Sequence, residues 1–121
     1  MGLADFFGNM LTGLCSHEAL NRATLPARDL ANRGGFDFTS VILDDVPSAV
    51  GSLPMVLAHA GIKYFIEGVN GERAPYATQG LQNPFYWEGP DGSRVLSSII
   101  GGYGMASGLF SSLEQAAGQL A

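Results

Sequence analysis

Two adjacent aspartates, Asp44 and Asp45, follow the most apolar run of the chain, residues 41–43. That run predicts a strand buried on both faces, as in a parallel sheet, and α/β proteins place ligand sites at the carboxyl ends of such strands. Because neighbouring residues on an extended segment point to opposite sides, only one of the two carboxylates can face a given pocket. The alternative is that both aspartates only form a turn and cap the helix that follows.

The aromatic run Phe85-Tyr86-Trp87 is a second candidate for chemistry. On a strand, Phe85 and Trp87 share one side and Tyr86 takes the other. An aromatic ring beside a carboxylate can stack on the apolar face of a sugar while the acid binds hydroxyl groups, so Trp87 is a candidate substrate contact. Core packing is the alternative for these side chains.

The spacing of the histidines and the cysteine predicts neither a metal site nor a catalytic nucleophile. His17 and His59 have no acid or cysteine at a metal-ligand spacing such as His-Glu-X-X-His, so we expect both to be ordinary helix residues. Cys15 is the one cysteine, and we expect it to be a small packed residue. A lone cysteine forms no internal disulfide, which favours a reducing, cytoplasmic setting.

The elements that must position these residues are predicted by hydrophobic spacing and by Gly and Pro signals. Residues 16–34 predict an amphipathic helix with a kink or break at Pro26. Residues 36–43 and 62–66 predict strands, joined by a helix that begins at about Leu53. A strand, a helix and a strand in about 30 residues form a βαβ unit, so the class is α/β.

The second half of the chain predicts a hairpin between less regular segments. Residues 84–88 and 94–100 flank the turn Gly89-Pro90-Asp91-Gly92 and pair as two strands. Residues 70–83 predict a long loop, and residues 109–120 predict a modest helix.

The composition and net charge argue against some classes of binding partner. The chain has 121 residues, 46% of them hydrophobic and 14% charged, and a net charge of −5. This composition favours a folded domain, and the negative charge argues against nucleic acid or an anionic membrane as the main partner. No stretch reaches the roughly 18 apolar residues of a membrane span.

Four segments in series resemble the N-terminal catalytic domain of glycoside hydrolase family 38, the α-mannosidases, and especially its divergent bacterial-type members. They are Asp45-Val-Pro-Ser-Ala-Val-Gly-Ser-Leu-Pro, Ala60-Gly-Ile-Lys-Tyr-Phe, Gly68-Val-Asn, and Phe85-Tyr-Trp-Glu-Gly-Pro-Asp-Gly-Ser-Arg-Val-Leu. Their order and spacing agree with the family over about residues 11–103.

The resemblance implies a partial seven-stranded β/α barrel built from the βαβ unit, the hairpin and flanking helices. It also implies a retaining glycosidase that hydrolyses α-mannosides with one zinc ion. Asp45 falls on the family's nucleophile and zinc ligand, and Asn70 and Tyr103 fall near the sugar subsite. Ser48-Ala49 replaces the family's usual Gly-His, the chain has no His-X-Asp pair, and no histidine follows His59 to match the family's later zinc ligand.

Two explanations account for these departures. Residues 1–121 are expected to be a fragment of a single barrel domain, with the rest of the parent barrel or self-association covering its open surfaces. Alternatively, the chain is a non-catalytic carbohydrate-binding or structural remnant of the fold. A polysaccharide deacetylase is a weaker possibility, since its His-X-X-X-His motif is absent.

Overall fold

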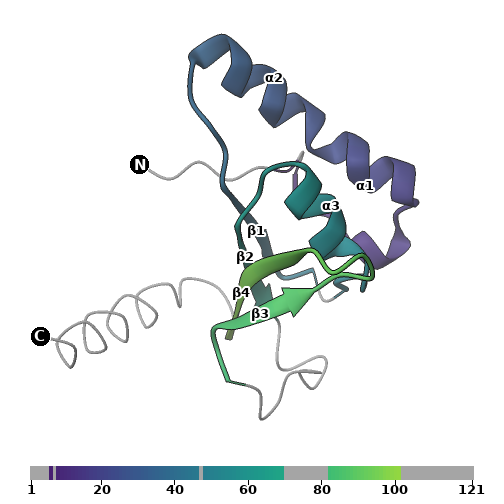
Figure 1. The fold of residues 1–121 in the computed structure, drawn as a ribbon. Coiled ribbons are helices and arrows are strands. Elements are labelled where there is room, and N and C mark those ends of the chain that lie inside the picture. The colour runs from purple at the N-terminus through teal and green to yellow at the C-terminus, as the bar shows by residue number, and fades with distance from the viewer. Residues whose placement is uncertain (1–5, 7, 47, 70–81, 102–121) are drawn as a thin grey trace, which may run out of the picture.

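The computed structural model describes residues 6, 8–46, 48–69 and 82–101 (Figure 1). The described helical elements are the short 3-10 helix η1 (Thr12–Leu14), α1 (His17–Ala23), α2 (Leu25–Gly34) and α3 (Leu53–His59). The strands are β1 (Ser40–Asp44), β2 (Tyr64–Val69), β3 (Phe85–Glu88) and β4 (Arg94–Gly101). None of the helices in these ranges combines the length and the apolar character needed to cross a bilayer.

The predicted first helix forms as two helices with a break just before Pro26. Ser16 caps α1, since its side chain accepts a hydrogen bond of 3.2 Å from the Ala19 N–H. Thr24 separates α1 from α2, and Pro26 lies in the first turn of α2, where its missing N–H costs no helical hydrogen bond. Gly35 ends α2 in the left-handed region at φ 67°, which glycine adopts without strain.

The four strands form one sheet in the order β1-β2-β4-β3. β1, β2 and β4 run parallel, and β3 pairs antiparallel with β4 through the predicted hairpin. The βαβ unit β1-α3-β2 and the mixed α/β class are therefore confirmed. The four described strands form an open sheet, so closure into a seven-stranded barrel stays a prediction. The loop expected at residues 70–83 falls mostly outside the described residues, and the helix expected at 109–120 falls wholly outside them.

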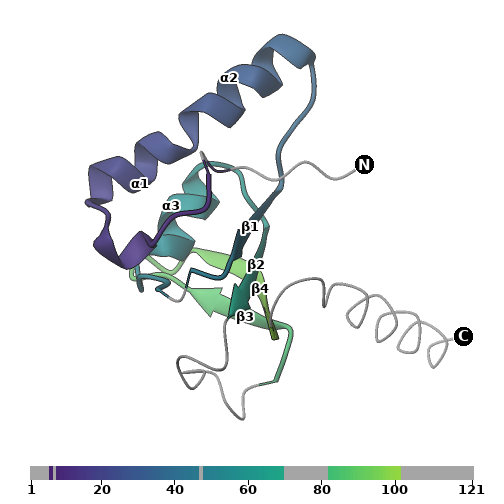
Figure 2. The same cartoon turned by 180° about the vertical axis from the view of Figure 1, so that it is seen from behind.

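One face of the sheet packs against α3 to make the core. Leu53 and Leu57 of α3 lie on Val41, Phe65 and Val95, and each of these five side chains is at most 1% exposed. Full burial of one such side chain contributes about 1.5–3 kcal/mol. Beyond α3, α1 packs against it on the same side of the sheet, and α2 extends this outer layer (Figures 1 and 2).

The other face, which we call the open face, has no described helix on it. It carries Ile42, Tyr64 and Tyr86, whose exposed fractions are 50%, 48% and 69%. The prediction that residues 41–43 are buried on both faces is therefore wrong for Ile42, because α3 covers only the side that holds Val41 and Leu43.

Candidate functional site

Asp44 ends β1 and places its carboxylate on the open face of the sheet. Side chains alternate along the strand, so Asp44 shares its side with the exposed Ile42 while Leu43 enters the core. Gly68 on β2 lies directly opposite Asp44 in the parallel register. A Cβ atom added at Gly68 would overlap Asp44 Oδ1 and lie 2.9 Å from its Cγ. Only glycine at this position leaves room for the carboxylate.

Asn9 holds the backbone of Asp44 in place. Asn9 Oδ1 accepts a hydrogen bond of 2.9 Å from the Asp44 N–H, and Asn9 Nδ2 donates to the Asp44 carbonyl. The side-chain amide thus pairs with β1 as a neighbouring strand would. The following η1 is fixed to the loop after β1, since Thr12 Oγ1 donates to the Ser48 carbonyl and accepts from the Val50 N–H at 3.2 Å.

Asp45 is the residue at which the chain turns away from the sheet. Its N–H donates to the Gly68 carbonyl over 2.7 Å, which extends the pairing of β1 with β2 by one bond. Its φ of 59° lies in the left-handed region, which aspartate tolerates better than most non-glycine residues. The next residue, Val46, packs against the core. Asp44 and Asp45 therefore differ in role, with Asp44 lying over Gly68 and Asp45 forming the turn.

Two buried side-chain atoms have no hydrogen-bond partner among the described residues, and both lie on the open face. They are Asp44 Oδ1 and Ser98 Oγ. Ser98 on β4 pairs in register with Ile66, which places it on the same face as Asp44. Strand spacings separate the two by about 7 Å along the strands and about 10 Å across them. Buried polar atoms are nearly always paired, so these two are exceptions in the described part of the chain.

Glu67 is a second carboxyl group at this end of the sheet, but it faces the other way. It pairs in register with Leu43 and therefore points to the face that α3 covers. The side chain is 5% exposed, and its burial raises the pKa of the Glu67 carboxyl above its ordinary value of 4.5. A raised pKa suits a general acid. Glu67 and Asp44 nevertheless lie on opposite faces, so they cannot act together on one ligand in this arrangement.

The structure does not bring Trp87 to the aspartates. Trp87 lies on β3, at the opposite edge of the sheet from β1, and its ring packs 5.8 Å from that of Phe65. Asp44 pairs in register with Gly68 on β2, and Gly68 pairs with Ile100 on β4. Trp87 pairs with Val95, which precedes Ile100 by five residues on β4. That offset is about 17 Å along the strands. Asn70 and Tyr103, the other two predicted sugar contacts, lie outside the described residues.

The described side chains do not supply a zinc site. Within residues 6, 8–46, 48–69 and 82–101, no three His, Cys, Asp or Glu side chains are placed to hold a metal ion. His17 is the first residue of α1, and His59 Nε2 lies 3.3 Å from Asp91 Oδ2 at the far end of the sheet from Asp44. Both are helix residues, as predicted. A zinc ion bound by Asp45 therefore stays a prediction that needs donors from outside these ranges.

The comparisons with known proteins give a fold and no family. No protein-family model matches the chain, and no curated relative matches it. The chain is similar to the crystal structure of a 4-alpha-glucanotransferase from Thermococcus litoralis, with a TM-score of 0.55 and 21% identity over 88% of this chain. It spans 16% of that enzyme's length. At this identity, the likeness shows a shared fold for the segment.

Sequence reasoning missed several residues that shape this site. Gly68 belongs to one of the four motif segments, but its contact with Asp44 depends on the register of β1 with β2. Asn9 and Ser98 had no signal, since nothing in their local sequence indicates pairing with β1 or burial without a partner. Glu67 lies one residue past the strand predicted over 62–66, and its burial depends on tertiary packing.

Proposed function

We propose that this chain is a segment of a carbohydrate-active enzyme whose sugar site includes the Asp44–Asp45 end of the sheet. One observation carries the proposal. The half-buried Asp44 carboxylate is held over Gly68 at the carboxyl ends of parallel strands, on the open face of the sheet. Sugar hydroxyl groups are donors that a carboxylate at this place would accept from. The fold likeness to a 4-alpha-glucanotransferase supports the same class of substrate.

The chemistry proposed for the site is glycosyl transfer with retention. One carboxylate attacks the anomeric carbon and forms a covalent glycosyl intermediate, while a second carboxyl group about 5–5.5 Å away protonates the leaving oxygen. Water, or another sugar hydroxyl, then attacks the intermediate and the second group takes up the proton. Because Glu67 points to the opposite face, the second carboxyl group would come from outside the described residues.

The resemblance of the four motif segments supports a more specific proposal. In it, the enzyme hydrolyses α-mannosides, with Asp45 as nucleophile and zinc ligand. The geometry favours Asp44 as the carboxylate that faces the substrate, because Asp45 occupies a left-handed turn. We therefore propose that the two aspartates have different roles. Asp44 would contact the sugar, and the position of Asp45 would depend on the rest of the parent barrel.

A non-catalytic carbohydrate-binding or structural role is the second candidate. It is favoured by the position of Glu67, the buried acid at this end of the sheet, which points to the opposite face from Asp44. Such a module would bind sugar through Asp44 without turnover.

The test is an activity assay on the chain with its flanking coding sequence restored. Asp44→Asn and Asp45→Asn would each be assayed on an aryl α-mannoside and on maltotriose. Asp29→Asn is the matched control, because Asp29 also carries one negative charge but pairs with Arg33 on the exposed surface of α2.

Loss of turnover by about a hundredfold or more in Asp44→Asn supports the geometric assignment, and the same loss confined to Asp45→Asn supports the motif assignment. Sugar binding without turnover in the unmutated protein supports the non-catalytic role. Turnover equal to that of Asp29→Asn in both variants contradicts a catalytic role for this end of the sheet.

A further inference from the structure

The positive charges of the described residues divide into two groups. Arg22, Arg33 and Arg94 each form an ion pair with an acid on the surface. Arg28 and Lys63 pair with no carboxylate among the described residues, although the chain carries a net charge of −5. Both of these unpaired cations line the same cavity, which has a volume of about 310 Å³.

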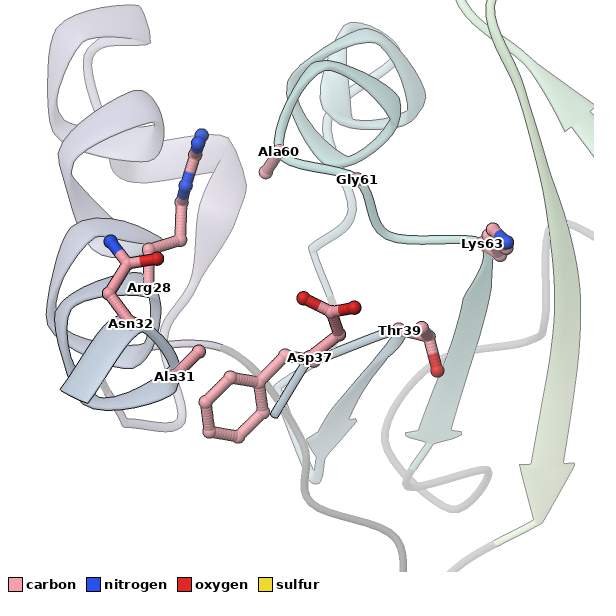
Figure 3. Close-up of a pocket in the computed structure, with 9 residues that line it drawn as sticks. Arg28, Ala31, Asn32, Asp37, Thr39, Ala60, Gly61 and Lys63 are labelled. Carbon is pink, nitrogen blue, oxygen red and sulfur yellow. The ribbon is translucent and has the colours of Figure 1, made fainter. Parts of the chain in front are cut away.

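This cavity, which we call the α2 pocket, lies at the amino ends of β1 and β2, away from Asp44. Its walls come from α2, from the segment that leads into β1 and from the turn between α3 and β2 (Figure 3). Arg28 and Asn32 stand four residues apart on α2 and so share one face of that helix. Lys63 is fixed to the segment before β1, because its N–H donates to the Thr39 carbonyl over 2.9 Å.

The polar groups of the pocket comprise positively charged donors and neutral groups that form hydrogen bonds. Arg28 can offer two parallel N–H donors to a phosphate or carboxylate, and Lys63 adds a compact positive charge. Asn32 and Thr39 can donate or accept hydrogen bonds. Asp37 lies between α2 and the start of β2 in Figure 3, and no ion pair joins it to either cation. The pocket therefore carries two positive charges and one negative charge, with none neutralised by direct contact.

We propose that the α2 pocket binds a small anionic sugar, a phosphorylated monosaccharide. Arg28 would hold the phosphate, and Asp37, Asn32 and Lys63 would take the hydroxyl groups. Asp37 disfavours a bare anion by like-charge repulsion, so a ligand gains from carrying hydroxyl donors beside its charge. The volume stands at the low end of the roughly 300–1,000 Å³ typical of ligand sites, which suits one sugar ring.

The proposal does not rest on catalysis at the aspartate end. The two sites lie at opposite ends of the parallel strands and share no residue. Asp44→Asn should leave binding in the α2 pocket unchanged, so failure of one proposal is distinguishable from failure of the other.

The test is a titration of the ¹⁵N-labelled chain with glucose 6-phosphate, inorganic phosphate and glucose, followed by amide chemical shifts. We expect saturable shifts at Thr39, Gly61 and Lys63, with the tightest binding for glucose 6-phosphate. Arg28→Gln should weaken that binding about tenfold, since it removes a charge-assisted contact. Arg33→Gln is the matched control, because it removes the same charge from the same helix outside the pocket and should change binding by less than about twofold at physiological salt.

Asp37→Asn tests the role of the carboxylate in selecting a sugar phosphate over inorganic phosphate. It should strengthen the binding of inorganic phosphate and shrink the preference for glucose 6-phosphate over phosphate. Circular dichroism would confirm that these exposed substitutions leave the fold intact. The proposal is overturned if no lining amide shifts, if Arg33→Gln weakens binding as much as Arg28→Gln, if glucose binds as tightly as its phosphate, or if Asp37→Asn leaves the preference unchanged.

Discussion

Replacing Gly68 with alanine should disturb the Asp44 carboxylate and nothing else nearby. The new Cβ would overlap Asp44 Oδ1 and lie 2.9 Å from Cγ, whereas the Asp44 Cα at 3.5 Å is an ordinary contact. The side chain must therefore leave its position, and we expect a cost of about 1–2 kcal/mol in the free energy of unfolding from the forced rotamer and local shift. Urea denaturation followed by circular dichroism would measure it.

A double-mutant cycle assigns that cost to the carboxylate. In an Asp44→Ala background the two clashing atoms are absent, so Gly68→Ala should be neutral or stabilise the fold by about 0.5 kcal/mol. Gly51→Ala is the control for the general effect of alanine, because nothing lies within 4 Å of its Cβ position. An equal cost of Gly68→Ala in both backgrounds would refute the placement of Asp44 over Gly68.

Three further predictions concern the surroundings of this site. Asn9→Ala removes both hydrogen bonds to the Asp44 backbone and should cost about 1–3 kcal/mol in urea unfolding; no change would show that the pairing contributes nothing. Glu67→Gln should raise stability at neutral pH, because the folded state holds the Glu67 proton more tightly than the unfolded chain and loses stability as pH rises above 4.5. The gain should disappear below that pH, and a gain independent of pH would contradict the raised pKa. The chain should self-associate in sedimentation experiments through its open face, and Ile42→Lys should reduce this while Leu14→Lys, at a residue 81% exposed on η1, should not. If the two lysine substitutions reduced association equally, the open face would be excluded as the surface through which the chain associates.

The local elements were predictable from the sequence because their signals are local. The break predicted at Pro26 acts on its own segment, and so do the Ser16 cap and the Gly35 stop that bound α1 and α2 in the structure. The hairpin followed from its turn residues. The βαβ unit followed from the alternation of an apolar run, a helix and a second run.

The arrangement of the candidate site was less predictable because it depends on contacts distant in sequence. Asp44 and Gly68 meet only through the register of β1 with β2, and Asn9 reaches Asp44 across 35 residues. The distance of Trp87 from the aspartates also depends on such contacts. Its strand pairs with β4 at the level of Val95, which places the ring against Phe65 in the core. Strand order and register, which composition does not encode, decide which polar residues share a face.

A titration of the ¹⁵N-labelled chain with methyl α-mannoside and with maltotriose would show whether the Asp44 end of the open face binds sugar. Binding at this end should give saturable amide shifts at Asp44, Gly68 and Ser98 with at least one of the two sugars, and Asp44→Asn should abolish these shifts. Absence of shifts at these residues with both sugars, or shifts that persist unchanged in Asp44→Asn, would contradict sugar binding at this end.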